Sequence, residues 1–228
     1  LFAAGLSYGS IFGDLESLIG ENDMLRESLG SNDAAAFFIG MLLVISALIA
    51  AVPALMINGR MLNEEKNGRL EVIIAGTLNK KVSRTKVFIT HYLYGIAAGI
   101  SAFLFTILGM YLASMNVDDL SITIKDYVLS AVNYSAGIIF ITGVSALFAG
   151  ISKKLHLTAW LYAAYIFFAN YFGVLINIDE VYLMLSPFYY LSDMPYESMD
   201  IKAVIIIAGL GIMLAVIGAA VFKRRNLL

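Results

Sequence analysis

The sequence predicts an all-α, polytopic protein whose helices cross a membrane several times. Hydrophobic residues make up 60% of its 228 residues and charged residues only 14%, against about 25% charged residues in a typical soluble domain. Mean hydropathy is +0.83. Five long stretches also lack Asp, Glu, Lys and Arg. A charged side chain at the centre of a bilayer costs roughly 2.5–3.5 kcal/mol, so membrane-spanning helices are expected to avoid these residues.

Each charge-free stretch is long enough to cross a membrane as a helix. About 20 residues, at a rise of about 1.5 Å per residue, cover a hydrocarbon core of roughly 30 Å. The predicted spans are 34–59, 87–117, 127–152, 155–178 and 203–222. Residues 1–13 are too few to span, and we expect them to be the tail of a first span. Residues 1–33 then hold this tail and an outer segment, and residues 34–228 hold a five-span region.

Composition excludes several classes of protein. So few charged residues cannot cover the surface of a soluble domain, and a disordered chain is far less hydrophobic. With 17 acidic and 15 basic residues, the chain lacks the basic excess of a nucleic-acid-binding protein. The absence of cysteine excludes disulfides, thiol catalysis and cysteine-ligated metals.

Basic residues predict the orientation in the membrane. If the segment after span 34–59 is cytoplasmic, 12 of the 15 lysines and arginines fall inside and 14 of the 17 acidic residues fall outside. Short cytoplasmic loops carry such an excess of Lys and Arg. We therefore predict a multi-pass protein of a cell membrane with its C-terminus in the cytoplasm.

Two predicted outer segments carry apolar residues. Segment 10–33 has the apolar spacing of an amphipathic helix, which would lie on the membrane surface or simply connect span ends. Segment 179–200 contains an apolar run too short to span, and Pro187 interrupts any helix there. This pattern favours a re-entrant or interfacial element. Its residues Pro187, Phe188, Tyr189 and Tyr190 would form an outer gate over a substrate path, or a lid that only buries loop backbone.

The predicted inner segment 58–86 is the most informative stretch outside the membrane. Two i,i+4 ion pairs can support short helices in it, and Gly68 interrupts the helical pattern between them. The pairs are Arg60/Glu64 and Glu65/Arg69, and a small apolar face of Leu70, Ile73 and Ile74 follows. A short helix of this kind is either a docking element for a soluble partner or a charged loop beside the spans.

The residues of this segment resemble a known signature. Residues 64–71 read Glu-Glu-Lys-Asn-Gly-Arg-Leu-Glu, and Val-Ser-Arg follows at 82–84. The pattern resembles the cytoplasmic signature of ABC-2 type transporter permeases, and most closely the branch of polyketide-antibiotic exporters. Residues 185–191 and the end of the last span are similar to the C-terminal half of that branch. The family often has a proline before Val-Ser-Arg, which residues 77–81 lack.

The resemblance implies a coupling helix that docks on a separate ATP-binding subunit. The residues to which it assigns this role are Glu64, Glu65, Gly68, Arg69, Leu70, Glu71, Ile73, Ile74 and Arg84. The implied partners are two copies of a cytoplasmic ABC ATPase, a second six-span half in the same full-length chain, and the lipid bilayer of a prokaryotic cell. Because the sequence has no phosphate-binding loop, ATP and Mg²⁺ would be bound by the ATPase, and this chain would bind no cofactor or metal.

Few other residues suggest a chemical role. Asn133 and Asn170 lie within predicted spans, where they would line a substrate path or hydrogen-bond neighbouring helices. Pro53 would kink its span, either as a hinge or as a tolerated transmembrane proline. His91 and His156 have no partner at metal-binding spacing, and we expect structural roles for them.

These observations favour the permease of an ATP-driven ABC exporter. It would move a hydrophobic or amphipathic compound, such as an antibiotic or another drug-like molecule, out of the cell by alternating access. Two alternatives stay open. One is a non-transporting membrane anchor or sensor that recruits a cytoplasmic partner, and the other is a lipid-modifying membrane enzyme.

Overall fold

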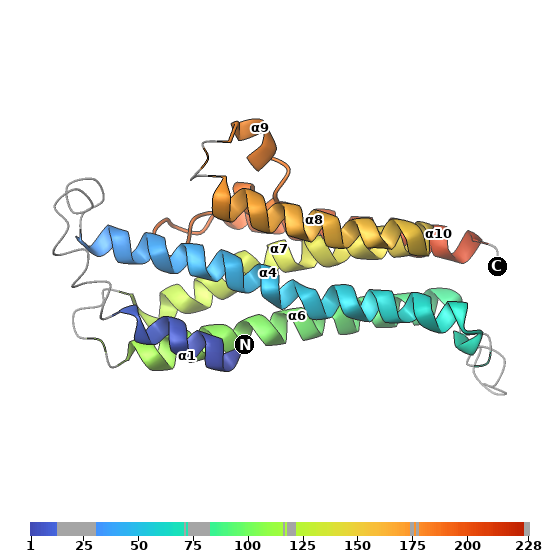
Figure 1. The fold of residues 1–228 in the computed structure, drawn as a ribbon, viewed down its shortest axis with the longest axis horizontal. Coiled ribbons are helices and arrows are strands. Elements are labelled where there is room, and N and C mark those ends of the chain that lie inside the picture. Colours follow the sequence, from blue (N-terminus) through green and yellow to red (C-terminus); the bar gives the residue numbers. More distant parts are fainter. Residues whose placement is uncertain are drawn as a thin grey trace.

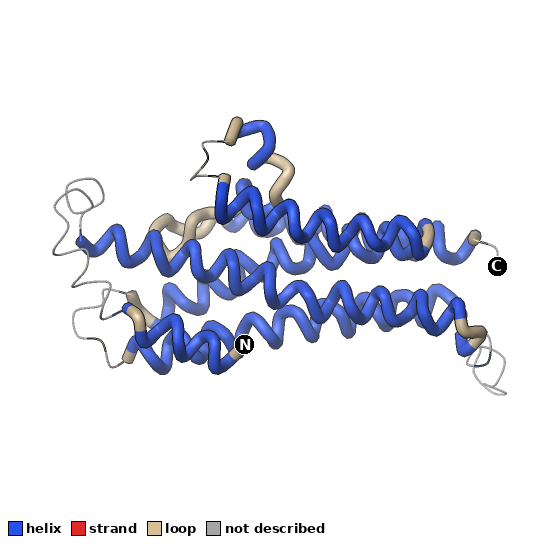
Figure 2. The backbone as a smooth tube through the Cα atoms, in the orientation of Figure 1, coloured by secondary structure: helices blue, strands red, loops and turns tan. Residues whose placement is uncertain are grey.

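The protein is an elongated bundle of long helices (Figures 1 and 2). The computed structural model describes residues 1–12, 31–70, 72, 83–115, 117, 122–173, 176 and 178–225. All regular structure in this part of the chain is helical, which confirms the predicted all-α class. Helices suit a membrane because each one pairs its own backbone N–H and C=O groups, for which hydrocarbon offers no other partner.

The described elements follow one another in a simple order, and consecutive long helices run in opposite directions (Figure 1). They are α1 (Phe2–Ser10), α4 (Ser31–Lys66), α6 (Arg84–Ser114), α7 (Ile124–Ile151), α8 (Lys153–Phe172), α9 (Glu180–Leu183), the 3-10 helix η1 (Pro187–Tyr190) and α10 (Ile201–Arg224). Most of the predicted amphipathic segment 10–33 lies outside the described residues.

Among the residues that the structure describes, four helices are long and apolar enough to cross a membrane, which confirms a polytopic protein. These stretches are Phe38–Lys66, Arg84–Ser114, Ile124–Ile151 and Ile201–Arg224. The predicted span 155–178 corresponds to α8, which has 20 residues and ends at Phe172. Because α8 includes two lysines, a histidine and three tyrosines, it is less apolar than the others, and its role as a fifth span stays a prediction.

Helix α7 forms the centre of the bundle and packs against α4, α6, α8 and α10. Two clusters of buried side chains surround it. The larger includes Leu43, Phe103 and Ile138. The smaller lies near the other end of α7 and includes Met61 and Phe222.

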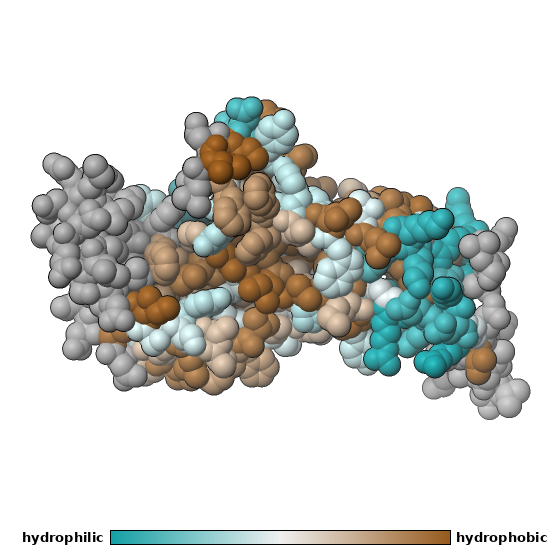
Figure 3. All heavy atoms as spheres, viewed as in Figure 1, coloured by the Kyte–Doolittle hydropathy of each residue, from teal (hydrophilic) through white to brown (hydrophobic). Residues whose placement is uncertain are grey.

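Basic residues gather at one end of the bundle. This end holds the last residues of α4, α7 and α10 and the first residues of α6 and α8. Figure 3 shows hydrophilic side chains concentrated there, while hydrophobic side chains cover much of the middle. We call it the basic end. Its assignment to the cytoplasmic side of the membrane stays a prediction.

Glycine residues allow a close contact between α7 and α10. A Cβ atom on Gly143 would lie 2.1 Å from the carbonyl oxygen of Gly211, and one on Gly150 would lie 2.2 Å from that of Gly218. Small residues allow membrane helices to approach closely. Gly211 and Gly218 of α10 therefore serve helix packing within this chain.

Replacing Gly143 with alanine is expected to lower the free energy of unfolding by about 1–3 kcal/mol, because the added methyl group forces two backbones apart. The matched control is Gly209→Ala, since nothing lies within 4 Å of a Cβ at that exposed position. Thermal unfolding in detergent compares the two variants. Equal unfolding temperatures would contradict the close contact.

Candidate functional site

The signature segment begins with a turn at the end of α4. The backbone of Gly68 has a φ of +69°, and its N–H donates to the carbonyl oxygen of Glu65 at 3.1 Å. A residue in this left-handed region after a helix is usually glycine, which has no Cβ to strain the backbone. The predicted interruption of the helix at Gly68 is therefore confirmed.

The residues beyond the turn divide between the core and the surface. Leu70 is 1% exposed and belongs to the smaller buried cluster. Arg69 and Val72 are exposed, and Arg69 forms no ion pair with any residue that the structure describes. Of the predicted docking residues, Glu71, Ile73 and Ile74 lie outside the described part of the chain.

Glu65 is turned inward and joins three helices. Its Oε1 lies 3.4 Å from Nη2 of Arg84 at the start of α6, and its Oε2 accepts a hydrogen bond from Arg225 just after α10. The side chain of Glu65 is only 13% exposed. The predicted Glu65/Arg69 pair is wrong, because Gly68 redirects the chain and Arg69 no longer continues the helical face that carries Glu65.

The two arginines are themselves held in place. Nη1 of Arg84 donates to the carbonyl oxygen of Arg225 at 2.8 Å, and Nη1 of Arg225 donates to that of Ala149 in α7 at 3.4 Å. Both guanidinium groups lie over the buried ring of Phe222, 5.3 and 5.1 Å from its centroid, a favourable cation–π distance. We call Glu65, Arg84, Phe222 and Arg225 the basic-end clamp. It connects the signature turn to α6, α7 and α10.

Glu64 faces a different environment from its neighbour. The predicted Arg60/Glu64 pair is confirmed, with Nε and Oε1 3.2 Å apart and the Arg60 side chain 78% exposed. The other carboxylate oxygen of Glu64 lies 3.8 Å from Nε2 of His91 in α6. Because His91 lies in a different helix from Glu64, residue spacing within α4 could not predict this second partner.

The predicted outer segment, residues 179–200, is fastened to α7 and α8 by polar side chains. Asn133 Nδ2 donates to the carbonyl oxygen of Ser192 at 2.9 Å, and Asn170 Nδ2 donates to Ser186 Oγ at 2.8 Å. Tyrosine hydroxyls make three more bonds to backbone carbonyls, namely Tyr134 to Met194, Tyr162 to Leu185 and Tyr165 to Tyr182. Both predicted in-span asparagines thus hold the outer segment.

Phe188 carries this segment into the bundle. Its ring is 4% exposed and packs on Gly137 of α7, where a Cβ would lie 2.5 Å from Phe188 Cε1. Gly137 lies 13 residues from the first residue of α7, a distance of about 20 Å at the helical rise. Pro187, the first residue of η1, is also buried.

The two tyrosines of η1 face outward. Tyr189 and Tyr190 are 36% and 50% exposed, and their rings meet edge to face with centroids 5.2 Å apart. The Tyr189 hydroxyl donates to the carboxylate of Glu180, and this bond raises the pKa of the phenol above its ordinary value. The predicted gate residues thus split into a buried pair and an exposed pair.

The other candidate residues, Pro53 and His156, lie within helices α4 and α8. Helix α4 continues through Pro53 to Lys66. His156 is buried, and its Nε2 lies 3.1 Å from Ser145 Oγ. Within the described residues, no group of three or more His, Cys, Asp or Glu side chains is placed to hold a metal ion.

A comparison with known protein families shows to which family this chain belongs. Residues 1–223 match the model described as the C-terminal domain of the multidrug efflux system permease Rv1217c. The chain belongs to this family of efflux permease domains. No curated protein matches the chain. A permease of this family is a transporter rather than an enzyme.

In this permease domain, Glu65→Gln is expected to lower the free energy of unfolding by about 1.5–3 kcal/mol, because two half-buried arginines lose their counter-charge. The adjacent Glu64→Gln is the matched control. It removes a pair with the largely exposed Arg60 and should cost only about 0.2–1 kcal/mol. Thermal unfolding of both variants measures the difference. A loss at Glu64 equal to that at Glu65 would argue against the clamp.

Replacing Asn133 with alanine is expected to loosen the outer segment. Loss of a hydrogen bond worth about 0.6–2 kcal/mol should speed amide hydrogen exchange in residues 186–194 by about 3- to 30-fold. Ser135→Ala, two residues away in α7, is the control and should leave exchange unchanged. If exchange in the segment is the same in both variants, Asn133 does not anchor it.

Proposed function

We propose that this permease domain is one half of an ATP-driven exporter, and that cytoplasmic ATPase subunits dock on its signature turn. The observation that carries the proposal is the arrangement around Gly68. The turn presents Arg69 and Val72 at the surface, while Glu65, directly before it, is bound to Arg84 and Arg225. A partner can therefore bind the turn, and a force on the turn passes to the clamp.

The clamp provides a route for motion through the bundle. ATP and Mg²⁺ bind to the partner subunits, whose closure pushes on the turn. Because the clamp fastens α4 to α6, α7 and α10, these helices move together as a rigid body. Helix α7 also contains Gly137, on which Phe188 packs. A displacement of α7 therefore shifts the outer segment. Alternating access follows when opposite ends of the bundle open in turn.

The cargo that we propose is a hydrophobic or amphipathic compound, as expected for a multidrug efflux domain and for the polyketide-antibiotic branch. The path lies between this half and a second six-span half, since a single bundle with a packed core encloses no channel. The exposed Tyr189 and Tyr190 act as the gate at the outer end of this path, and the buried Phe188 anchors them in the bundle.

Replacing Arg69 with alanine is expected to weaken ATPase binding to the full-length permease at least tenfold, or about 1.4 kcal/mol. The guanidinium group is exposed and has no ion-pair partner among the described residues, so its loss should affect docking and leave the fold intact. Co-purification with the ATPase measures binding. Lys223→Ala is the matched control, because Lys223 is an exposed basic residue of the same end.

Two outcomes would contradict the proposal. Equal binding by wild type and the Arg69 variant would remove Arg69 from the docking surface. ATPase binding without ATP-dependent uptake of an amphipathic dye into inside-out vesicles would identify the chain as a membrane anchor rather than an exporter.

A further inference from the structure

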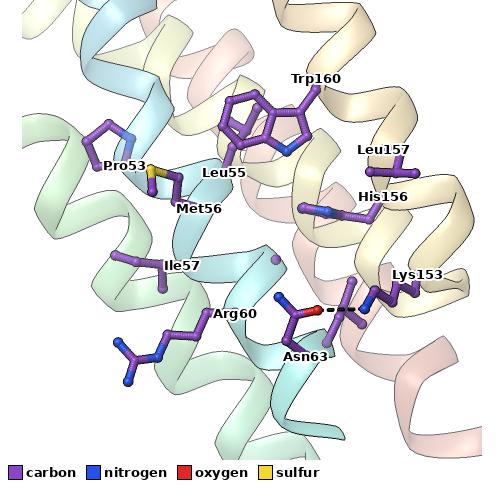
Figure 4. Close-up of a pocket in the computed structure, with 12 residues that line it drawn as sticks. Pro53, Leu55, Met56, Ile57, Arg60, Asn63, Lys153, His156, Leu157 and Trp160 are labelled. Atoms are coloured by element: carbon purple, nitrogen blue, oxygen red, sulfur yellow. Dashed lines mark hydrogen bonds between the residues drawn. The ribbon is translucent and has the colours of Figure 1, made fainter. Parts of the chain in front are cut away.

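A groove lies between α4 and α8 at the basic end (Figure 4). It has a volume of about 660 Å³, and its walls are apolar side chains that include Pro53, Met56, Leu157 and Trp160. The polar groups that line it belong to Arg60, Asn63, Lys153 and His156. None of the described lining residues carries a carboxylate, but Arg60 is paired with Glu64 outside the groove. The groove therefore combines apolar walls with the positive charge of Lys153.

Lys153 is held at the mouth of this groove. It is the first residue of α8, and its Nζ donates to Asn63 Oδ1 of α4 at 2.6 Å. The contact, drawn as a dashed line in Figure 4, spans the gap between the two helices. Because its partner is a neutral amide, the ammonium charge of Lys153 is not neutralised by this contact and remains available to an anion.

A buried chain of hydrogen bonds holds His156 beside the groove. Asn58 Nδ2 donates to Ser145 Oγ at 3.1 Å, and His156 Nε2 lies 3.1 Å from the same hydroxyl oxygen. The Cε1–Nδ1 edge faces Gly59, which also lines the groove.

We propose that this groove binds an anionic phospholipid, with the headgroup phosphate at Lys153 and an acyl chain along Met56, Leu157 and Trp160. The charge of the groove and its apolar walls match the two parts of such a lipid. Basic pockets between membrane helices bind anionic headgroups. This lipid site is separate from the signature turn and does not depend on ATPase docking.

Trp160 provides a direct probe, because it is the one tryptophan of the chain. The full-length protein is reconstituted in phosphatidylcholine vesicles that contain a fixed fraction of either acyl-brominated phosphatidylglycerol or acyl-brominated phosphatidylcholine. Bromine quenches nearby indole fluorescence, and the difference between wild type and Trp160→Phe isolates the signal of Trp160. We expect about fivefold preference for phosphatidylglycerol beside Trp160, which corresponds to about 1 kcal/mol.

Two variants distinguish a specific lipid-binding site from a general attraction of anionic lipid to basic residues. Lys153→Gln removes the charge, keeps a group that can bond to Asn63, and should abolish the preference. Lys154→Gln removes the same charge from the next residue, which does not line the groove, and should preserve it. Equal quenching by both lipids in wild type, or equal loss in both variants, would overturn the proposal.

A second arm tests the source of the anion. An excess of inorganic phosphate should leave quenching by phosphatidylglycerol unchanged, because phosphate lacks the acyl chain. Displacement of the lipid by phosphate would assign the groove to a free anion and overturn the lipid assignment. The assay contains no ATPase, so its failure is distinguishable from failure of the proposed docking.

Discussion

Hydrocarbon offers no water to an unpaired backbone amide or carbonyl, so each stretch of chain near the membrane must find its partners within the protein. A long helix pairs its own backbone amides and carbonyls, but the irregular segment around Pro187 cannot pair all of its own. Its carbonyl groups accept hydrogen bonds from Asn133, Tyr134 and Tyr162. Polar side chains on otherwise apolar helices can therefore be mistaken for residues of a substrate path. In this bundle, those near the predicted outer segment hold the backbone of that segment in place.

Helix α7 links the two ends of the molecule. At the basic end, the carbonyl oxygen of Ala149 accepts a hydrogen bond from Arg225 of the clamp. Near its middle, α7 lies so close to α10 that Gly143 and Gly211 leave no room for a side chain, and Gly137 seats Phe188. A packed helix transmits displacement without deforming, because its contacts are as dense as those of a crystal. The proposed route from ATPase docking to the outer gate depends on this rigidity.

Local features were predictable from the sequence, and tertiary partners were not. Charge-free length identified the long apolar helices, and Gly68 was recognised as a helix break because its effect is confined to neighbouring residues. Glu65 was paired with the wrong arginine, since Arg225 lies 160 positions away and helical spacing carries no information about contacts between helices. The predicted span 155–178 extends beyond α8, which ends at Phe172, because the spacing of charged residues does not show where a helix ends.

The most direct test of the central claim asks whether the signature turn contacts an ATPase. Residues 1–228 contain no cysteine, so Arg69→Cys introduces a single attachment point in this domain for a short photoreactive cross-linker, and Lys223→Cys provides a control at the same end. In membranes that contain the ATPase, we predict a cross-linked product from position 69 and none from position 223. No product from position 69, or equal products from both positions, would contradict the account.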